Sequence, residues 1–422
     1  MKSIFTIIVS LSIITAQAQR LPDRIYSSTI NGVKLFQQNN QFSQPILQLN
    51  TGDQLELHFD DLAPYPKNYF YTYELCNADW TPANVSVFDY LKGFNQMRIS
   101  QYRVASIASM KYIHYQVQLP ERNAMPILSG NYILKVFRDG DTSKLAFTKR
   151  LMVVEKQVSI AAQIQVPYDN QLARTHQKLQ FSVEVKALNL MSPQQIKVVA
   201  MQNNRWDDAI VNKQPVFIKE NLLEYNGEMD YLFQAGKEFR WADLQSFRFE
   251  SDRIAKVERA EEPYTVFMKP DQARNNFAYI NFVDRNGYTE INSSESVNPW
   301  WQGDYAWVHF SFNPPGKQPI AGKSIHMIGE ITGNQISDSS LMQFNSLEGA
   351  YTKDLLLKQG YYSYAYVTKD KRDPSISSDL SLTEGNYWET ENEYTILVYY
   401  RSLSGRHDEL VGISTINSRF GR

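Results

Sequence analysis

The chain has 422 residues and a single cysteine, Cys76, so an intrachain disulfide is excluded. A lone cysteine between leucine and asparagine is expected to be a small buried apolar residue rather than a reactive thiol. The chain also lacks an excess of charge of one sign: its formal net charge of −2 excludes the basic footprint of a nucleic-acid-binding surface. After residue 19, no apolar run is long enough for a membrane-spanning helix.

The common catalytic and metal-binding motifs are missing as well. The sequence contains no nucleophile elbow, no zinc-protease helix motif and no phosphate-binding loop. Its six histidines are scattered, and none has ligand spacing to another histidine or to the cysteine. Adjacent carboxylates such as Asp60 and Asp61 point to opposite faces of a strand, so they make a poor acid–base pair. The sequence therefore predicts a protein that is not an enzyme and has no cofactor and no metal ion.

One segment begins like a calcium-binding loop. Asp284, Asn286 and Gly287 have the spacing of its first positions and Glu295 supplies a final carboxylate, but Tyr288 stands where another ligand is needed. Asparagine, aspartate and glycine also favour an ordinary hairpin turn, because their backbones tolerate positive φ. We favour the turn, and the calcium loop is the alternative.

The N-terminus has the pattern of a secretory signal peptide over residues 1–18. Lys2 provides the positive charge, residues 4–14 form a short apolar core, and Ala16 and Ala18 place small side chains at the expected cleavage site. No cysteine follows this site, so a lipid anchor is not expected. The sequence predicts an exported chain that functions outside the cytoplasm.

Aromatic residues are abundant, with 26 tyrosines, 22 phenylalanines and 7 tryptophans, and apolar residues recur with a period of two. In residues 113–119, apolar and polar side chains alternate as they do in a half-buried strand, and residues 145–154 are a second predicted strand. Asp139-Gly140, before the second strand, is a favoured hairpin turn. No long amphipathic helix is evident. We therefore predict an all-β fold of tandem immunoglobulin-like β-sandwich domains. The predicted domains cover residues 19–155, 156–298 and 299–422.

A row of tyrosines raises the question of carbohydrate binding. Tyr362, Tyr364 and Tyr366 would share one face of a strand and could stack on sugar rings, and Trp300-Trp301 adds a second aromatic pair. The other interpretation, which we favour, is aromatic packing between two sheets. A periplasmic or surface glycan-binding β-sandwich protein is therefore the alternative function.

Several short motifs, taken in order, resemble the Bacteroidetes type IX secretion system plug protein family. They lie at 76–80, 89–94, 112–115, 119–120, 129–132, 202–207, 233–240, 284–287, 357–362 and 390–394. The motif positions expected to have structural or partner-binding roles are Trp80, Tyr90, Gly93, Gly130, Asn131, Tyr132, Asn203, Trp206, Asn286, Gly287, Gln359, Gly360 and Tyr361.

This resemblance implies a periplasmic protein at the inner face of the outer membrane. It would bind a large outer-membrane translocon barrel through protein contacts and occlude its periplasmic opening when no cargo is passing. The family has no catalytic residues to transfer, and neither nucleic acid nor a small-molecule substrate is expected. The third predicted domain also resembles a glycogen-binding-type module over Met327-Ile328-Gly329 and 358–361, but the usual tryptophan after Gly360 is missing.

Overall fold

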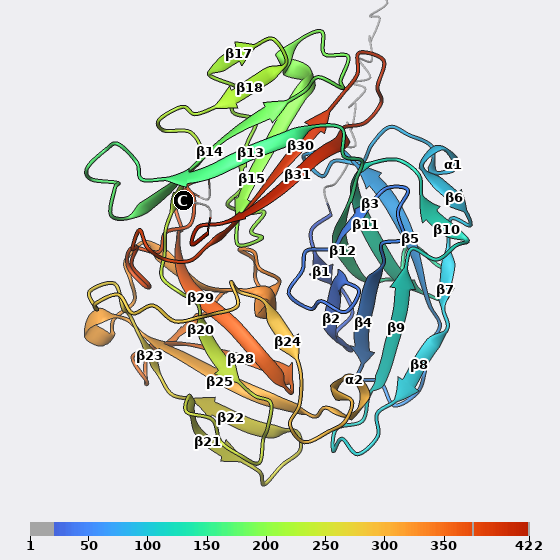
Figure 1. Ribbon diagram of the computed structural model, residues 1–422. Coiled ribbons are helices and arrows are strands. Elements are labelled where there is room, and N and C mark those ends of the chain that lie inside the picture. Colours follow the sequence, from blue (N-terminus) through green and yellow to red (C-terminus); the bar gives the residue numbers. More distant parts are fainter. Residues whose placement is uncertain (1–20, 374, 421–422) are drawn as a thin grey trace, which may run out of the picture.

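The computed structural model describes residues 21–373 and 375–420, so the predicted signal peptide lies outside the described residues. β-Strands account for 45% of the chain and helices for 4%, which confirms a predominantly β protein with several antiparallel sheets. The two α-helices, α1 (Val87–Tyr90) and α2 (Pro299–Gln302), are single turns. Across the described ranges, no helix is long and apolar enough to cross a membrane. The strands form three units, each made of two larger sheets (Figure 1).

The first unit contains the N-terminal strands. One sheet has the order β1-β12-β11-β5-β7 with β3 paired to β12, and the other has the order β2-β4-β9-β8. A separate two-stranded sheet is formed by β6 and β10. The bounds are β1 Arg24–Ile25, β2 Ile30–Gln37, β3 Ile46–Gln48, β4 Leu55–Asp61, β5 Tyr69–Cys76, β6 Leu91–Gly93, β7 Met97–Ile99, β8 Gln101–Val104, β9 Ile113–Leu119, β10 Ala124–Pro126, β11 Gly130–Arg138 and β12 Leu145–Val154.

An aromatic core joins the two larger sheets of the first unit. Phe59 of β4 and Tyr115 of β9 are register partners whose rings stack at 5.0 Å between centroids. Tyr69, from β5 in the opposite sheet, meets Tyr115 edge-on at 4.9 Å. Because alternate residues of a strand share a face, the period-two pattern in the sequence directs these rings inward. Cys76 is also buried, and burial raises the pKa of its thiol to about 12, as expected for an unreactive side chain.

The second unit is completed by strands from the C-terminal end of the chain. Its sheets have the orders β13-β14-β18-β17, with β19 paired to β14, and β16-β15-β30-β31. Phe181 of β14 and Val398 of β30 belong to the core between them. The bounds are β13 Ser159–Gln165, β14 His176–Glu184, β15 Ile196–Gln202, β16 Ile210–Val211, β17 Phe217–Lys219, β18 Leu222–Tyr225, β19 Leu232–Gln234, β30 Glu393–Tyr400 and β31 Glu409–Asn417.

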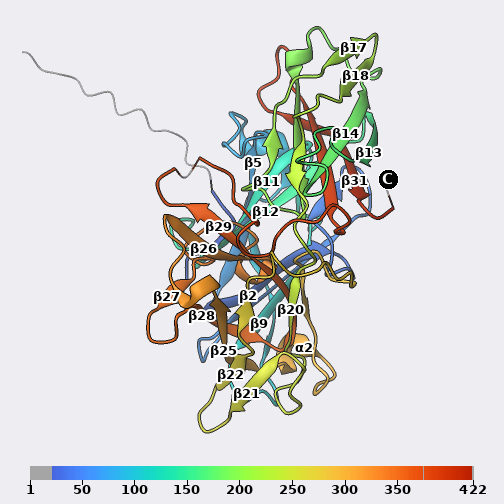
Figure 2. The same ribbon diagram turned by 90° about the vertical axis from the view of Figure 1, so that its left-hand side faces the viewer.

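The third unit pairs the sheet β20-β29-β24, with β26 on β29, against the sheet β21-β22-β25-β28-β27, with β23 on β25. The bounds are β20 Arg240–Asp243, β21 Ile254–Glu258, β22 Tyr264–Met268, β23 Asp271–Gln272, β24 Thr289–Ile291, β25 Tyr305–Asn313, β26 Lys323–Ile328, β27 Gln343–Asn345, β28 Ala350–Lys358 and β29 Gly360–Asp370. The β17–β18 and β21–β22 hairpins lie at opposite ends of the molecule (Figures 1 and 2).

The tyrosine row on β29 lies inside the third unit. Tyr364 and Tyr366 have no exposed surface and pack against Phe310 and Phe312 of β25, with ring centroids 5.2 and 4.7 Å apart. Tyr362 is 3% exposed. These tyrosines face the opposite sheet rather than solvent, so aromatic packing is confirmed and this row offers no surface to a sugar.

Strand pairing crosses the predicted boundary between residues 298 and 299 in both directions. β30 and β31 follow that boundary but extend the second unit through β15, whereas β20 and β22 precede it but pair with β29 and β25 of the third unit. The polar segment 292–303 thus connects β24 to β25 within one unit. Alternation shows which residues a strand buries, but it does not specify the strand's partner, because distant strands can be equally compatible.

This topology predicts that residues 156–298 will not fold as an isolated fragment. The fragment lacks β30 and β31, which cover the core and the pairing edge of β15, and it carries strands whose partners lie after residue 300. We expect its circular dichroism melt to show no cooperative transition, whereas the full chain should unfold cooperatively. A sharp transition in the fragment would contradict the observed division of strands.

Candidate functional site

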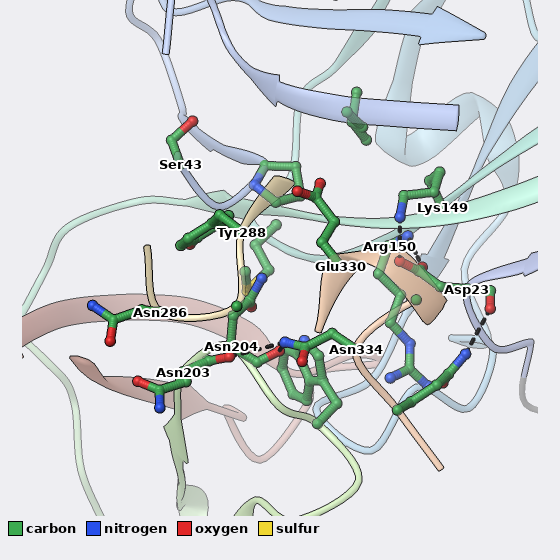
Figure 3. Close-up of a pocket in the computed structure, with 17 residues that line it drawn as sticks. Asp23, Ser43, Lys149, Arg150, Asn203, Asn204, Asn286, Tyr288, Glu330 and Asn334 are labelled. Atoms are coloured by element: carbon green, nitrogen blue, oxygen red, sulfur yellow. Dashed lines mark hydrogen bonds and ion pairs between the residues drawn. The ribbon is translucent and has the colours of Figure 1, made fainter. Parts of the chain in front are cut away.

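The three units meet around a small cavity of about 70 Å³, shown in Figure 3. Each unit contributes side chains to its wall. The first unit supplies Asp23, Ser43, Lys149 and Arg150, the second supplies Asn203, Asn204 and Trp206, and the third supplies Asn286, Gly287, Tyr288, Glu330 and Asn334.

Turns with left-handed asparagines form one side of this junction. Asn203, Asn204, Asn286 and Asn334 have φ values of 48°, 58°, 46° and 51°. Asparagine accepts this conformation more readily than most residues, because its short polar side chain makes local hydrogen bonds. Asn334 Nδ2 donates to the carbonyl oxygens of Asn203 and Asn204 at 2.9 and 3.1 Å, which ties the third unit to the second.

Part of the polar lining is not used by the protein itself. Within the described residues, the buried Oδ1 atoms of Asn286 and Asn334 and the hydroxyl of Tyr288 have no hydrogen-bond partner. The Oδ1 orientation of Asn334 is set by its donating Nδ2, so this oxygen is available to a donor. These three oxygens are thus buried at the junction without a hydrogen-bond partner among the described residues.

Two tryptophans and an arginine join the first unit to the second. The indole rings of Trp80 and Trp206 meet edge-on with centroids 4.8 Å apart. The guanidinium of Arg150 lies 4.5 Å from the Trp80 ring centroid and 5.7 Å from that of Trp206. The face of an indole ring attracts a cation, most strongly where water is excluded, so this stack is a stabilising contact between units.

A buried carboxylate strengthens the same interface. Asp408, 1% exposed, accepts a hydrogen bond from the backbone N–H of Ala78 in the first unit at 3.0 Å. Its oxygens also pair with Lys197 at 2.9 Å and Arg401 at 2.7 Å. Nearby, the Tyr399 hydroxyl donates to Oδ1 of Asn131 at 2.8 Å. These contacts fix β30 and β31 against the first unit.

A buried ion pair joins the first unit to the third. Asp60 of β4 and Lys358 of β28 are each about 2% exposed, and Lys358 Nζ lies 2.6 Å from Asp60 Oδ2. The Tyr305 hydroxyl donates to the same oxygen at 2.5 Å, and His114 Nδ1 lies 2.7 Å from Oδ1. Three groups from two units therefore share one carboxylate, which compensates for its removal from water.

Aromatic stacking continues this contact. The His58 imidazole lies between two groups: its Nδ1 is 3.1 Å from Nε2 of His114, and its ring stacks on Trp300 at a centroid distance of 3.9 Å. The guanidinium of Arg103 lies 4.6 Å from the centroid of Trp301. Both tryptophans of the α2 turn are thus used to hold the first unit, which removes them as a sugar-stacking platform.

Side chains of the first unit also seal a sheet edge of the third. The side-chain amide of Gln41 accepts from the Ile291 N–H at 2.9 Å and donates to the Ile291 carbonyl at 3.2 Å. Lys34 Nζ donates to the Thr289 carbonyl and to Glu330 Oε2, both at 2.6 Å. Since β24 is an edge strand, these contacts occupy backbone groups that would otherwise be open to another strand.

Comparison with known proteins identifies the first unit. Residues 30–155 match the model of the family described as Type 9 secretion system plug protein 1st domain. This part of the chain belongs to the type 9 secretion system plug protein family. Residues 30–155 are called the plug domain below.

The whole fold also occurs in a solved structure. A hypothetical protein from Parabacteroides merdae ATCC 43184, whose crystal structure is at 2.30 Å resolution, is 29% identical, with a TM-score of 0.90. The alignment covers 94% of this chain and 100% of that chain. No curated protein matches.

The junction brings together five of the motif positions predicted from the sequence. Asn203, Trp206, Asn286 and Gly287 line the same cavity, and Trp80 of the plug domain lies beside it against Trp206. Gly287 has a φ of 83°, and a Cβ there would lie 2.9 Å from the Phe239 ring. A role of these residues in partner binding stays a prediction, whereas the contacts of Asn203, Trp80 and Trp206 between units are observed.

Other predicted positions lie within the plug domain or at its edge. Tyr90 donates to the Tyr73 carbonyl, and Tyr132 donates to that of Leu128. Gly130 has a φ of 149° and a Cβ there would lie 3.0 Å from the Leu75 side chain. Gly93 has a φ of 101°, and a Cβ there would lie 2.1 Å from the Asn123 carbonyl oxygen.

The last three predicted positions connect segments of the third unit. Gln359 accepts from the Asp304 N–H at 3.0 Å and donates to Glu295 at 2.8 Å. A Cβ on Gly360 would lie 2.4 Å from the Glu290 carbonyl oxygen. The Tyr361 ring lies under the Arg285 guanidinium, 3.9 Å from its carbon.

The segment that begins like a calcium loop forms a turn at Asn286-Gly287, but not the predicted hairpin, because no strand of the described residues lies between β23 and β24 to precede it. Asp284 Oδ1 accepts from the Asn286 N–H at 3.0 Å, and its other oxygen accepts from the Phe239 N–H. Burial raises the pKa of Asp284 to about 6. In the part of the chain that the structure covers, no group of three His, Cys, Asp or Glu side chains is arranged to hold a metal ion.

Sequence reasoning missed the residues that attach the plug domain to the third unit. Asp60 was considered only as a partner of Asp61, and His114 and Lys358 had no assigned role. The available signal was the alternation in β4, where His58 and Asp60 occupy the face opposite Leu57 and Phe59. That polar face suggested solvent, yet the third unit covers it.

Burial controls the charges at this interface. Burial lowers the pKa of His114 to about 4, although Asp60 favours the imidazolium. Burial likewise lowers the pKa of His58, against the effect of Glu56. Burial alone would raise the pKa of Asp60, but Lys358 and His114 outweigh it and hold that pKa below its usual value. At neutral pH the histidines are therefore neutral and Asp60 is ionised.

Replacing Lys358 by methionine is expected to destabilise the chain by about 3–5 kcal/mol, because it leaves Asp60 as an uncompensated buried charge. Urea unfolding measures this loss. The matched control, Lys256→Met, removes a lysine from an exposed pair with Glu258 and should cost less than about 1 kcal/mol. Equal effects of the two changes would contradict the assigned role of the buried pair.

Acidification is expected to reduce stability through His114. Its folded pKa of about 4 lies below the ordinary value of 6.5, so the unfolded state binds more protons between these values. Its stabilising contribution is complete above about pH 6.5 and is lost as the pH falls toward 4. At pH 4 the free energy of unfolding has decreased by about 3 kcal/mol through this group. The His114→Asn variant should lose less stability than wild type over this interval in urea titrations at successive pH values. If the free energies of unfolding of wild type and His114→Asn decreased in parallel with falling pH, this role of His114 would be refuted.

Proposed function

We propose that this chain is the periplasmic plug subunit of a type 9 protein secretion translocon. It binds the large outer-membrane barrel and occludes its periplasmic opening when no cargo is passing. The observation that carries the proposal is the match of residues 30–155 to the plug family. A plug acts by steric exclusion, so the function calls for a rigid protein surface rather than for reacting groups.

The contacts around the plug domain support such a mechanism. Asp60–Lys358 attaches it to the third unit, and Asp408 with the Trp80–Trp206 pair attaches it to the second. Buried ionic and aromatic contacts on two sides restrict independent rotation of the plug domain. We infer that the chain enters and leaves the barrel opening as one body, with each unit an immunoglobulin-like sandwich.

The plug family is a secretion family and not an enzyme family. The glycan-binding alternative depended on the tyrosine row and on Trp300-Trp301. The tyrosines fill the core of the third unit, and Trp300 stacks on His58. Neither group therefore supports sugar binding, and we propose no second function.

Affinity purification from outer membranes tests the partner. The tagged full chain, expressed in its own host, should recover one large outer-membrane barrel protein after mild detergent extraction. The untagged chain is the control. Recovery of other envelope proteins without a large barrel would contradict the proposal.

Permeability tests the occlusion itself. Deleting the gene should raise the leakage of a normally excluded dye across the outer membrane, because unoccupied barrels stay open, and re-expression of the wild type should reverse it. Unchanged permeability in a strain that still assembles the translocon would overturn the gating role.

A further inference from the structure

A small ribbon on the outer side of the plug domain carries an unusual set of exposed side chains. It consists of α1 and the antiparallel pair β6 and β10, with Lys92 opposite Met125. Its inner face is anchored: Tyr90, Leu91 and Ala124 are buried in the core of the plug domain. In Figure 1, α1, β6 and β10 lie together at the periphery, on the far side of the plug domain from the third unit.

The outer face carries four exposed apolar side chains among polar and charged ones. Phe88 is 78% exposed and Phe94 63%, and Ile127 and Met125 are 40% and 37% exposed. They come from one continuous ribbon, because the Phe94 N–H donates to the Asn123 carbonyl and the Ile127 N–H donates to the Tyr90 carbonyl. An exposed cluster of this kind, on a surface already anchored to a core, marks an interaction site.

The charged side chains of the ribbon leave it positive. Lys92 and Arg122 are exposed, and no ion pair engages either of them within the described part of the chain. Of the two nearby acids, Asp89 lies 3.9 Å from Arg406. Burial raises the pKa of the second acid, the half-buried Glu121. With Asp89 paired to Arg406, Lys92 and Arg122 outnumber the remaining acid, Glu121, and the charge of the ribbon is positive.

The ribbon has a fixed shape. At Gly93 the backbone has a φ of 101°, and a Cβ would lie 2.1 Å from the Asn123 carbonyl oxygen, so only glycine allows β10 to approach this closely. The Tyr90 hydroxyl donates to the Tyr73 carbonyl at 3.1 Å, which fixes the end of α1. Phe88 and Phe94 are thus presented by a fixed backbone rather than by a loose loop.

We propose that this ribbon binds a lipid bilayer surface that contains anionic headgroups. Phenylalanine, methionine and isoleucine enter the region between headgroups and acyl chains, while Lys92 and Arg122 pair with lipid phosphates. Protein hot spots are instead enriched in tryptophan, tyrosine and arginine that fill a partner's pocket. The ribbon exposes no tryptophan and no tyrosine, since Tyr90 points into the core, and its exposed arginine, Arg122, is assigned to lipid phosphate. The lipid surface is thus the partner that its chemistry fits.

Vesicle co-sedimentation tests this proposal without the translocon. The full chain is mixed with large vesicles of phosphatidylethanolamine and phosphatidylglycerol, and separately with phosphatidylcholine vesicles. We expect binding to the anionic vesicles that weakens as salt is raised, and little binding to phosphatidylcholine. Phe88→Ser with Phe94→Ser should reduce the partition coefficient about tenfold or more, since leaving even one phenylalanine ring in water forfeits a factor of this order.

Two further variants make the result specific. Lys92→Gln with Arg122→Gln should abolish the preference for anionic vesicles, and Phe249→Ser, an equally exposed phenylalanine of the third unit, should bind like wild type. Unchanged circular dichroism melts verify folding. No binding by wild type, or equal binding by the Phe88/Phe94 variant, would overturn the proposal. Loss of the translocon barrel from the Phe88/Phe94 variant, with no vesicle binding by wild type, would identify a protein partner instead.

Discussion

The buried carboxylate of Asp60 is the constraint on which the arrangement of the units depends. It lies on the plug domain, but two of its partners, Lys358 and Tyr305, belong to the third unit. Separating the units would leave a carboxylate and an ammonium without their partners, and two buried charges strongly favour staying together once they have left water. Further contacts between the units add to this ion pair. They are the asparagine turns, the Trp80–Trp206 contact and the side chains that cover the edge strand β24.

Much of the fold was predictable because strands leave a local signature. The alternation in 113–119 and the Asp139-Gly140 turn predicted β9 and the β11–β12 hairpin, and the aromatic content predicted cores packed with rings. The order of the sheets was not predictable in this way. β30 and β31 complete the second unit, although strands of the third unit such as β24 and β25 lie between them and β15 in the chain. Nothing local in the sequences of β30 and β31 specifies β15 as a partner.

The site was predictable only in part, for a related physical reason. Asn203, Asn286 and Gly287 were selected as positions of motifs that resemble a known family, and Asn286 and Gly287 also form a recognisable turn signal. His58, Asp60 and Lys358 did not stand out, because polar residues on one face of a strand usually face water. Here another unit covers that face, and only the tertiary structure shows that the charges are paired.

A protein held together in this way can block an opening without chemistry of its own, and this is the central claim. The most direct test is the ionic conductance of the purified translocon barrel in a planar bilayer, measured before and after the protein is added to the periplasmic side. The account predicts that saturating protein closes the conductance and that washing it away restores the open level. An open conductance that persists with the protein bound would contradict it.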